Sequence, residues 1–98
     1  MGHSFGTVDF LMKSRLRDAA RGRPEAFYEL GVAFAAGADG VDVDLIEAHK
    51  WFNLAAVHGS LRAQQSRAEI AEDMTAREIM EAQRQARAWI AAGERRVA

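Results

Sequence analysis

The three histidines of the chain are the first candidates for metal binding or acid–base catalysis: His3, His49 and His58. His49 and His58 are nine positions apart, so on one helix their side chains point to roughly opposite faces and cannot share a metal ion. His3 lies in a glycine-rich start of the chain. The sequence has no cysteine, which excludes disulfides, thiolate catalysis and cysteine-bound zinc. We therefore expect no metal site.

Three aspartates in one short segment raise the question of calcium: Asp39, Asp42 and Asp44. Their spacing lacks the Asp-x-Asp-x-Asp-Gly order and the distal glutamate of an EF-hand, and roles in turns and helix caps explain them better. The sequence also has no glycine-rich phosphate loop, Gly-x-Ser-x-Gly elbow or His-Glu-x-x-His motif. We expect no cofactor and no enzymatic activity.

Charge is unevenly distributed, although the net charge is −1 and the isoelectric point is about 6.3. Residues 13–23 contain five basic residues and one aspartate, a net charge of +4. This stretch is either a solvated helix face or a basic patch for an acidic partner or nucleic acid. The chain as a whole is not basic, and the stretch has no interleaved aromatic residues, so we favour the solvated face.

The elements that must position these residues are helices. Apolar residues recur with helical spacing almost from end to end, while proline occurs once and strand-like alternation is nearly absent, which predicts an all-α fold. We expect one domain, residues 1–98, because 98 residues bury only a single modest core. Its expected parts are an N-terminal helix within 7–22, hairpin units over 24–59 and 60–93, and a loose tail over 94–98. No segment resembles an export signal or a membrane span, so a cytoplasmic protein is expected.

Capping signals set the expected helix boundaries. Thr7 is placed to cap the first helix, and Pro24 suits the first turn of the second. Two further starts have the three-residue spacing of a capping box, Asp44 with Glu47 and Thr75 with Glu78. The glycines expected to end helices are Gly22, Gly59 and Gly93.

The two hairpin units are copies of one sequence pattern. Residues 45–59 align without gaps on residues 79–93, an offset of 34, and the preceding helices align with an offset of 37. The second copy has lost the aromatic pair that the first carries at Trp51 and Phe52. Such a degenerate copy is typical of a terminal capping repeat, which presents a polar outer face.

The first unit resembles the Sel-one-like repeat, a bacterial-type relative of the tetratricopeptide repeat. The matching residues are Ala26, Tyr28, Leu30, Gly31, Phe34, Gly37, Gly40, Val41, Asp44, Ala48, Trp51, Phe52, Ala55, Ala56 and Gly59. Its loop between Gly37 and Gly40 is one residue longer than the family's, and the second unit matches only weakly. The resemblance implies a short right-handed α-solenoid of about five helices that serves as a protein–protein interaction adaptor or scaffold.

The partner-binding candidates are Phe27, Glu29, Lys13 and Arg17. Phe27 lies one residue from the expected core stripe, so either the N-terminal helix covers it or it contacts a partner or a second copy. We expect another protein as partner and no membrane. The alternative hypothesis is a small nucleic-acid-binding or regulatory protein that uses residues 13–23.

Overall fold

The fold is all-α, as the sequence predicts. The computed structural model describes residues 4–97, with side chains over 10–95, and this part of the chain contains helices and no strand. The helices are α1 (Ser4–Ala20), α2 (Pro24–Ala36), α3 (Leu45–Val57), α4 (Leu61–Ala71) and α5 (Ala76–Val97). None of these helices is long and apolar enough to span a bilayer.

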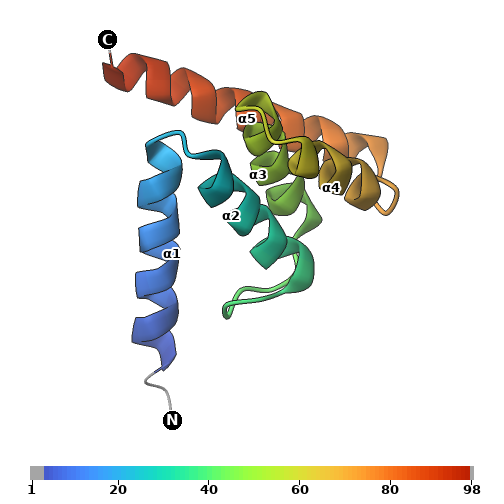
Figure 1. Ribbon diagram of the computed structural model, residues 1–98. Helices are drawn as coiled ribbons and strands as arrows, with labels where there is room; N and C mark the ends of the chain where they lie inside the picture. Colours follow the sequence, from blue (N-terminus) through green and yellow to red (C-terminus); the bar gives the residue numbers. More distant parts are fainter. Residues whose placement is uncertain (1–3, 98) are drawn as a thin grey trace.

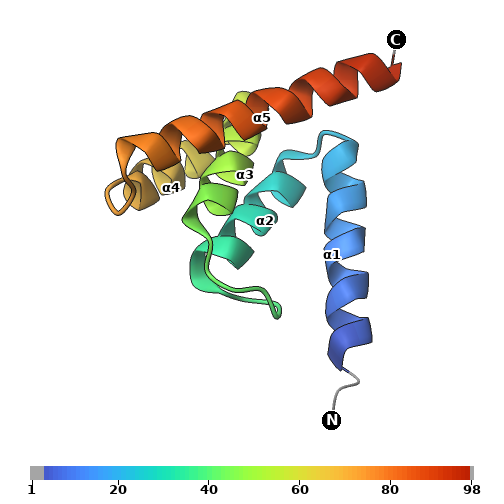
Figure 2. The ribbon, with the colours of Figure 1, turned by 180° about the vertical axis from the view of Figure 1, so that it is seen from behind.

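Helix α3 lies at the centre of the molecule. It runs back alongside α2, its most extensive neighbour, and also packs against α4 and α5 (Figure 1). The largest fully buried side chains are Phe27, Leu30 and Leu54, and alanines of α3, α4 and α5 complete the core. The main neighbour of α1 is α2, and the first turns of α1 and the last turns of α5 extend beyond the packed centre (Figure 2).

A glycine allows α2 and α3 to approach closely. A Cβ atom on Gly31 would lie only 2.4 Å from Cδ1 of Phe52, far inside ordinary van der Waals contact. The Phe52 ring therefore occupies the space above the backbone of α2, and the Tyr28 ring packs against it at 5.5 Å between centroids. Trp51 is also buried and forms an edge-to-face pair with Trp89 of α5 at 4.9 Å.

Of the two predicted capping boxes, one forms completely and the other forms only its N-cap hydrogen bond. The Thr75–Glu78 box is confirmed: the amide of Glu78 donates to Thr75 Oγ1 at 3.1 Å, and the amide of Thr75 donates to Glu78 Oε1 at 2.8 Å. Asp44 caps α3 as predicted, accepting from the amide of Glu47 at 3.1 Å. Its amide, however, donates to the carbonyl of Phe34, which leaves the carboxylate of Glu47 free for other donors.

Three predicted boundaries can be compared with the helices. Gly59 ends α3 in the left-handed conformation, with φ of 100°, as expected. Helix α1 begins at Ser4, so the prediction of Thr7 as its N-cap is wrong. The prediction that the last helix ends at Gly93 is also wrong, because α5 continues to Val97. Gly93 has ordinary helical backbone, and the next two residues, Glu94 and Arg95, are good helix formers.

Candidate functional site

Phe27 is a core residue, so its prediction as a partner contact is wrong. Its side chain is 1% exposed. The ring lies 5.0 Å from the His58 ring and 6.4 Å from the Trp89 ring, measured between centroids. Helices α3 and α5 therefore cover Phe27, together with Ala19 from the buried end of α1. The ring lines a hollow of about 250 Å³ between α1 and α5 but exposes almost none of its surface there.

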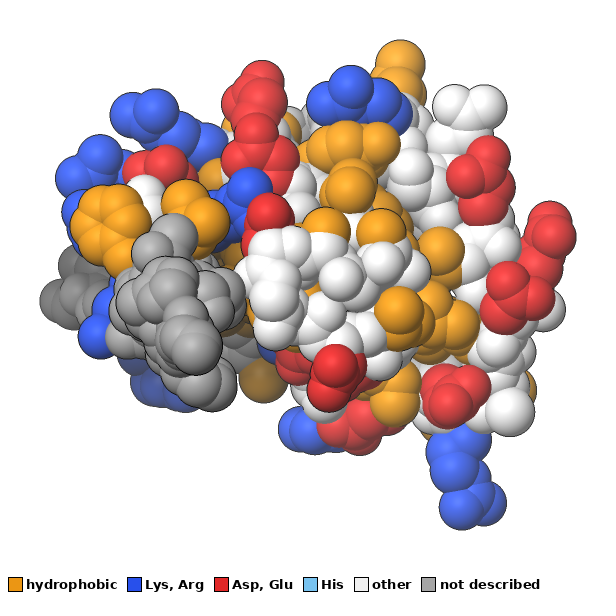
Figure 3. All heavy atoms as spheres, turned by 90° about the horizontal axis from the view of Figure 1, so that it is seen from below, with side chains coloured by type: hydrophobic (Ala, Val, Ile, Leu, Met, Phe, Trp, Pro, Cys, Tyr) orange, Lys and Arg blue, Asp and Glu red, His pale blue; other side chains and the backbone are white. Residues whose placement is uncertain are grey.

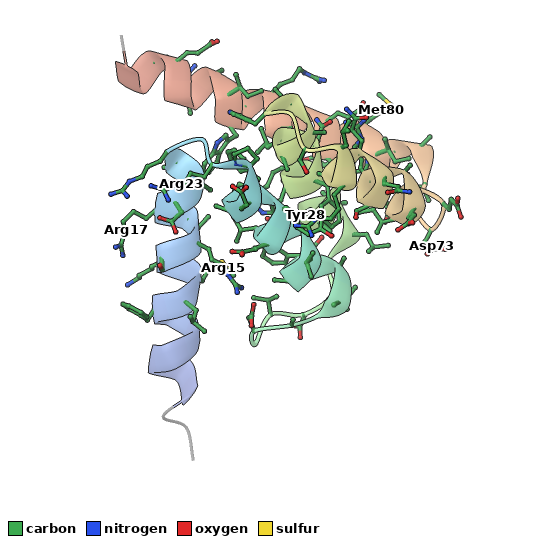
Figure 4. All side chains as sticks on the ribbon, in the orientation of Figure 1. Arg15, Arg17, Arg23, Tyr28, Asp73 and Met80 are labelled. Atoms are coloured by element: carbon green, nitrogen blue, oxygen red, sulfur yellow. The ribbon has the colours of Figure 1, made fainter. Side chains whose placement is uncertain are left out.

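The other predicted partner-binding residues are exposed but do not form one site. Lys13 and Arg17 lie on α1, and Glu29 lies on α2. Arg17 projects away from the rest of the molecule, whereas Arg15 projects toward α2 and forms an ion pair with Asp39 of the α2–α3 loop (Figure 4). The basic stretch is thus divided between an outward-facing set and one inward-facing arginine.

Glu29 lies on a concave surface that two adjoining hollows form between α1, α2 and α4. The first, of about 220 Å³, is lined by Pro24, Glu25, Tyr28, His58, Gly59, Ser60 and Arg62. The second, of about 240 Å³, is lined by Arg15, Tyr28, Glu29, Val32, Ala33, Ala38, Asp39 and Arg62. Because Tyr28 and Arg62 line both, we treat the two hollows as one surface and call it the α2–α4 groove.

Tyr28 and Arg62 bridge the groove between its two helices. The Arg62 guanidinium carbon lies 4.1 Å from the centroid of the Tyr28 ring, a cation–π geometry. The first turn of α4 presents Arg62 because Ser60 caps this helix, accepting from the amide of Ala63 at 3.1 Å. Tyr28 is held from behind by Phe52. The groove therefore has a floor of fixed position and an exposed cation beside it.

The rim of the groove is polar and its floor is partly apolar. Glu25 and Glu29 are exposed one turn apart on α2, and Val32, 39% exposed, continues the same face. The Arg15–Asp39 ion pair closes the end near α1. Each hollow is smaller than a typical site for a drug-sized molecule, and together they match side chains of an extended segment better than one compact ligand.

The histidine and the serine that line the groove both interact with nearby backbone. Nδ1 of His58 lies 2.8 Å from the carbonyl of Leu54, and the Ser60 hydroxyl is used as a cap. No nucleophile paired with a base is among the lining residues. Among the described residues, no group of histidine and acidic side chains could hold a metal ion. The groove can bind a partner by stacking, charge and hydrogen bonding.

A larger hollow of about 540 Å³ runs along the outer face of α5 but has no convergent groups. Its lining comes from one helix: Arg77, Met80, Glu81, Arg84 and Arg87. Hydrogen bonds from Arg84 and Gln85 lower the pKa of Glu81 to about 2, so this carboxylate stays ionised at neutral pH. Because Glu81 is already paired with Arg84 and the walls come from one helix only, this hollow is the weaker candidate.

No family model, curated protein or solved structure matches the chain. The groove therefore has to be interpreted from its own residues. Sequence reasoning identified Glu29 and missed Tyr28, Arg62 and Arg15 as members of one surface. The spacing of Glu25, Glu29 and Val32 along one helical face was the available signal for the α2 side.

Proposed function

We propose that this protein is a non-catalytic interaction module that binds a segment of another protein in the α2–α4 groove. The observation that carries the proposal is the Tyr28–Arg62 pair, which links two helices at the floor of a concave surface. Aromatic and arginine side chains provide a large share of binding energy in protein interfaces. The exposed acidic residues Glu25 and Glu29 supply charge selectivity along the rim.

We further propose that the α2–α3 hairpin and the successive helices α4 and α5, which pack mainly on α3 and less on each other, are units of a short right-handed α-solenoid of the Sel-one-like type, with α1 as an N-terminal half-unit. Two neighbour relations support stacking of the units. The equivalent helices α3 and α5 pack together, and the equivalent helices α2 and α4 meet through Tyr28 and Arg62. In stacked repeats, equivalent helices of successive units are neighbours, and the inner row presents the binding surface.

Affinity capture from the native cell extract tests this function. The wild-type chain is compared with two groove variants, Arg62→Glu and Glu29→Lys, and with the control Arg87→Glu, which reverses an exposed charge outside the groove. We expect a protein that the wild type and the control capture and both groove variants lose. Equal capture by all four chains would contradict the proposal.

Mapping with the purified partner provides the decisive second step. Binding should shift the backbone amide signals of α2 and of the first turn of α4 in heteronuclear NMR spectra. Shifts confined to α1 or to the outer face of α5 would place the interaction elsewhere. The circular-dichroism spectrum of each variant establishes that the helices remain intact.

Nucleic-acid binding through residues 13–23 has less support. Arg15 faces α2 and is paired with Asp39, so the basic residues of this stretch do not all share one face. Phosphate binding of this kind falls steeply with salt, and a mobility-shift assay at two salt concentrations would detect it.

A further inference from the structure

Opposite ends of the molecule carry exposed charges of opposite sign. At one end are Arg17, Arg21 and Arg23, and at the other are Glu69, Glu72 and Asp73. Within the described part of the chain, none of these six residues has an ion-pair partner. Figure 4 shows Arg17 and Arg23 on the outer side of α1 and Asp73 at the far corner, where α4 leads into α5.

The space-filling view shows the same separation. Seen from below, most Lys and Arg side chains lie at the left, over α1, and the right-hand side carries several Asp and Glu side chains (Figure 3). The molecule measures 39 by 37 by 23 Å, so the two ends are too far apart for their side chains to meet within one copy. We call them the basic face (Phe10, Arg17, Arg21 and Arg23) and the acidic corner (Glu69, Glu72, Asp73 and the half-buried Met74).

The acidic corner is electrostatically unfavourable for an isolated chain. Its three carboxylates lie within five residues and repel one another, and Glu69 and Glu72 also lie at the negative end of the α4 dipole. The basic face likewise concentrates three arginines within seven residues. Such local conflicts without compensation inside the fold are typical of surfaces that meet a partner.

The basic face also carries an apolar anchor. Phe10 is 65% exposed, and it precedes Arg17 by seven residues, which places both side chains on the same face of α1. The packed side of this helix is formed by Met12, Leu16 and Ala19. Over residues 10–20, the outer face of α1 therefore carries an exposed aromatic ring and Arg17, and Arg21 and Arg23 follow in the turn that leads into α2.

We propose that copies of this chain associate head to tail, with the basic face of one copy on the acidic corner of the next. The charges are opposite in sign and equal in number, and Met74 beside Asp73 offers an apolar contact for Phe10. Two different surfaces of each copy are used, so the contact is heterologous and leaves one basic face and one acidic corner free for further copies. This association goes beyond the groove and does not depend on it.

The contact should be weak and sensitive to salt. Each exposed ion pair contributes little to binding, and salt screens charges beyond ~10 Å at 0.1 M. Sedimentation velocity of the wild type should therefore show a weight-average mass that rises with protein concentration at about 20 mM salt and falls to that of one copy at about 300 mM. A single-copy mass at low salt and at protein concentrations up to ~1 mM would overturn the proposal.

Charge reversal separates specific contact from general attraction. One triple variant reverses the basic face (Arg17→Glu, Arg21→Glu, Arg23→Glu), and another reverses the acidic corner (Glu69→Arg, Glu72→Arg, Asp73→Arg). Each alone should be a single copy, because both of its surfaces then have the same sign. Their equimolar mixture should associate again. A control with the same change in net charge as the first variant, Arg84→Glu, Arg87→Glu and Arg95→Glu, should associate like the wild type.

Cysteine cross-linking identifies the surfaces in contact, since the chain has no cysteine of its own. Under mild oxidation, a mixture of the Arg17→Cys and Asp73→Cys variants should form the mixed disulfide in preference to either homodimer. A dominant Arg17→Cys homodimer would show symmetric pairing of α1 and overturn the head-to-tail arrangement. A chain that stays single but binds an oligonucleotide through the three arginines would assign the basic face to nucleic acid instead.

Discussion

Gly31 and Gly93 both lie inside helices, but only Gly31 faces another side chain. A Cβ atom at Gly31 would meet the Phe52 ring at 2.4 Å, whereas nothing lies within 4 Å of a Cβ at Gly93. We expect Gly31→Ala to lower the free energy of unfolding by about 1–3 kcal/mol through overpacking. Gly93→Ala should raise it by roughly 0.5–1 kcal/mol, because alanine has the higher helix propensity. Urea unfolding curves measure both changes.

A compensating substitution at Phe52 provides a second test of the contact with Gly31. Shortening the opposing side chain with Phe52→Leu should recover part of the stability lost in Gly31→Ala, so the two substitutions should not be additive. Stabilisation by Gly31→Ala of the same size as by Gly93→Ala would show that the backbone of α2 and the Phe52 ring are not in close contact.

His49 is a buried histidine with an unpartnered nitrogen. It is 3% exposed, and its Nδ1 atom has no hydrogen-bond partner among the described residues. Burial lowers the pKa of His49 below its ordinary value of 6.5, and the positive charge of Arg67 lowers it further. Arg67 reaches this region from α4, where it bonds the side chain of Asn53 on α3. The folded chain therefore holds His49 neutral.

This environment predicts that stability falls as the medium is acidified. Below pH 6.5 the unfolded chain gains a proton at His49 that the folded chain does not accept, so the free energy of unfolding decreases as pH falls from 6.5 toward the lower folded-state pKa. The slope approaches about 1.4 kcal/mol per pH unit. His49→Gln should remove it, and His58→Gln, which retains His49, is the matched control. Identical slopes in the wild type and His49→Gln would contradict the neutral, buried assignment.

At the level of single elements, the start of α5 depends on a reciprocal cap. Thr75→Ala should cost about 1 kcal/mol, because the amide of Glu78 loses its acceptor. Glu78→Ala removes the acceptor for the amide of Thr75. Because the two side chains hold each other in place, the double variant should lose less than the sum of the single variants. Strict additivity in this cycle, measured by chemical denaturation, would argue against a cooperative box.

Helix starts could be predicted where the signal is local, and helix ends only in part. The Thr75–Glu78 box and the Asp44 cap depend on residues three positions apart, so the sequence contains all that determines them. The predicted hydrogen bond from the amide of Asp44 to Glu47 does not form. The Glu47 carboxylate instead accepts from Trp51 Nε1 at 3.0 Å and pairs with Lys50. Likewise, Gly59 adopts positive φ and ends a helix while Gly93 does not, because good helix formers come directly after Gly93.

The candidate site was harder to predict than the elements, because it depends on how helices cross. Glu29 was identified as an exposed residue of α2 from its position beside the core stripe. Phe27 also lies beside the core stripe, so the sequence left open whether it is buried. Contacts with His58 and Trp89, which come from distant parts of the chain, bury it. The contact of Tyr28 with Arg62 joins residues 34 positions apart, and helical spacing within one element cannot predict it.

At the scale of the whole molecule, the fold has α3 at its centre, and the other helices differ in how extensively they pack against their neighbours. Helix α3 contacts α2, α4 and α5, and its Ala48, Leu54 and Ala55 are completely buried. Helix α1 has α2 as its main neighbour and contributes Ala19 as its one fully buried side chain in the described range. Helices with few buried apolar contacts open locally at lower free energy than the global unfolding transition.

These differences in packing predict the order in which the amides of the helices exchange with solvent. The amides of α3 should exchange last, at a free energy near that of global unfolding, and those of α1 should exchange first among the helices. Head-to-tail association should slow exchange in α1 and at the end of α4 at low salt, because the basic face and the acidic corner are then covered, and leave α3 unchanged. Mass spectrometry of peptides from α1, α3 and α4 at two salt concentrations measures these effects. Equal protection of α1 and α3 in the single copy would mean that α1 is as firmly docked as the central helix, contrary to its small buried surface.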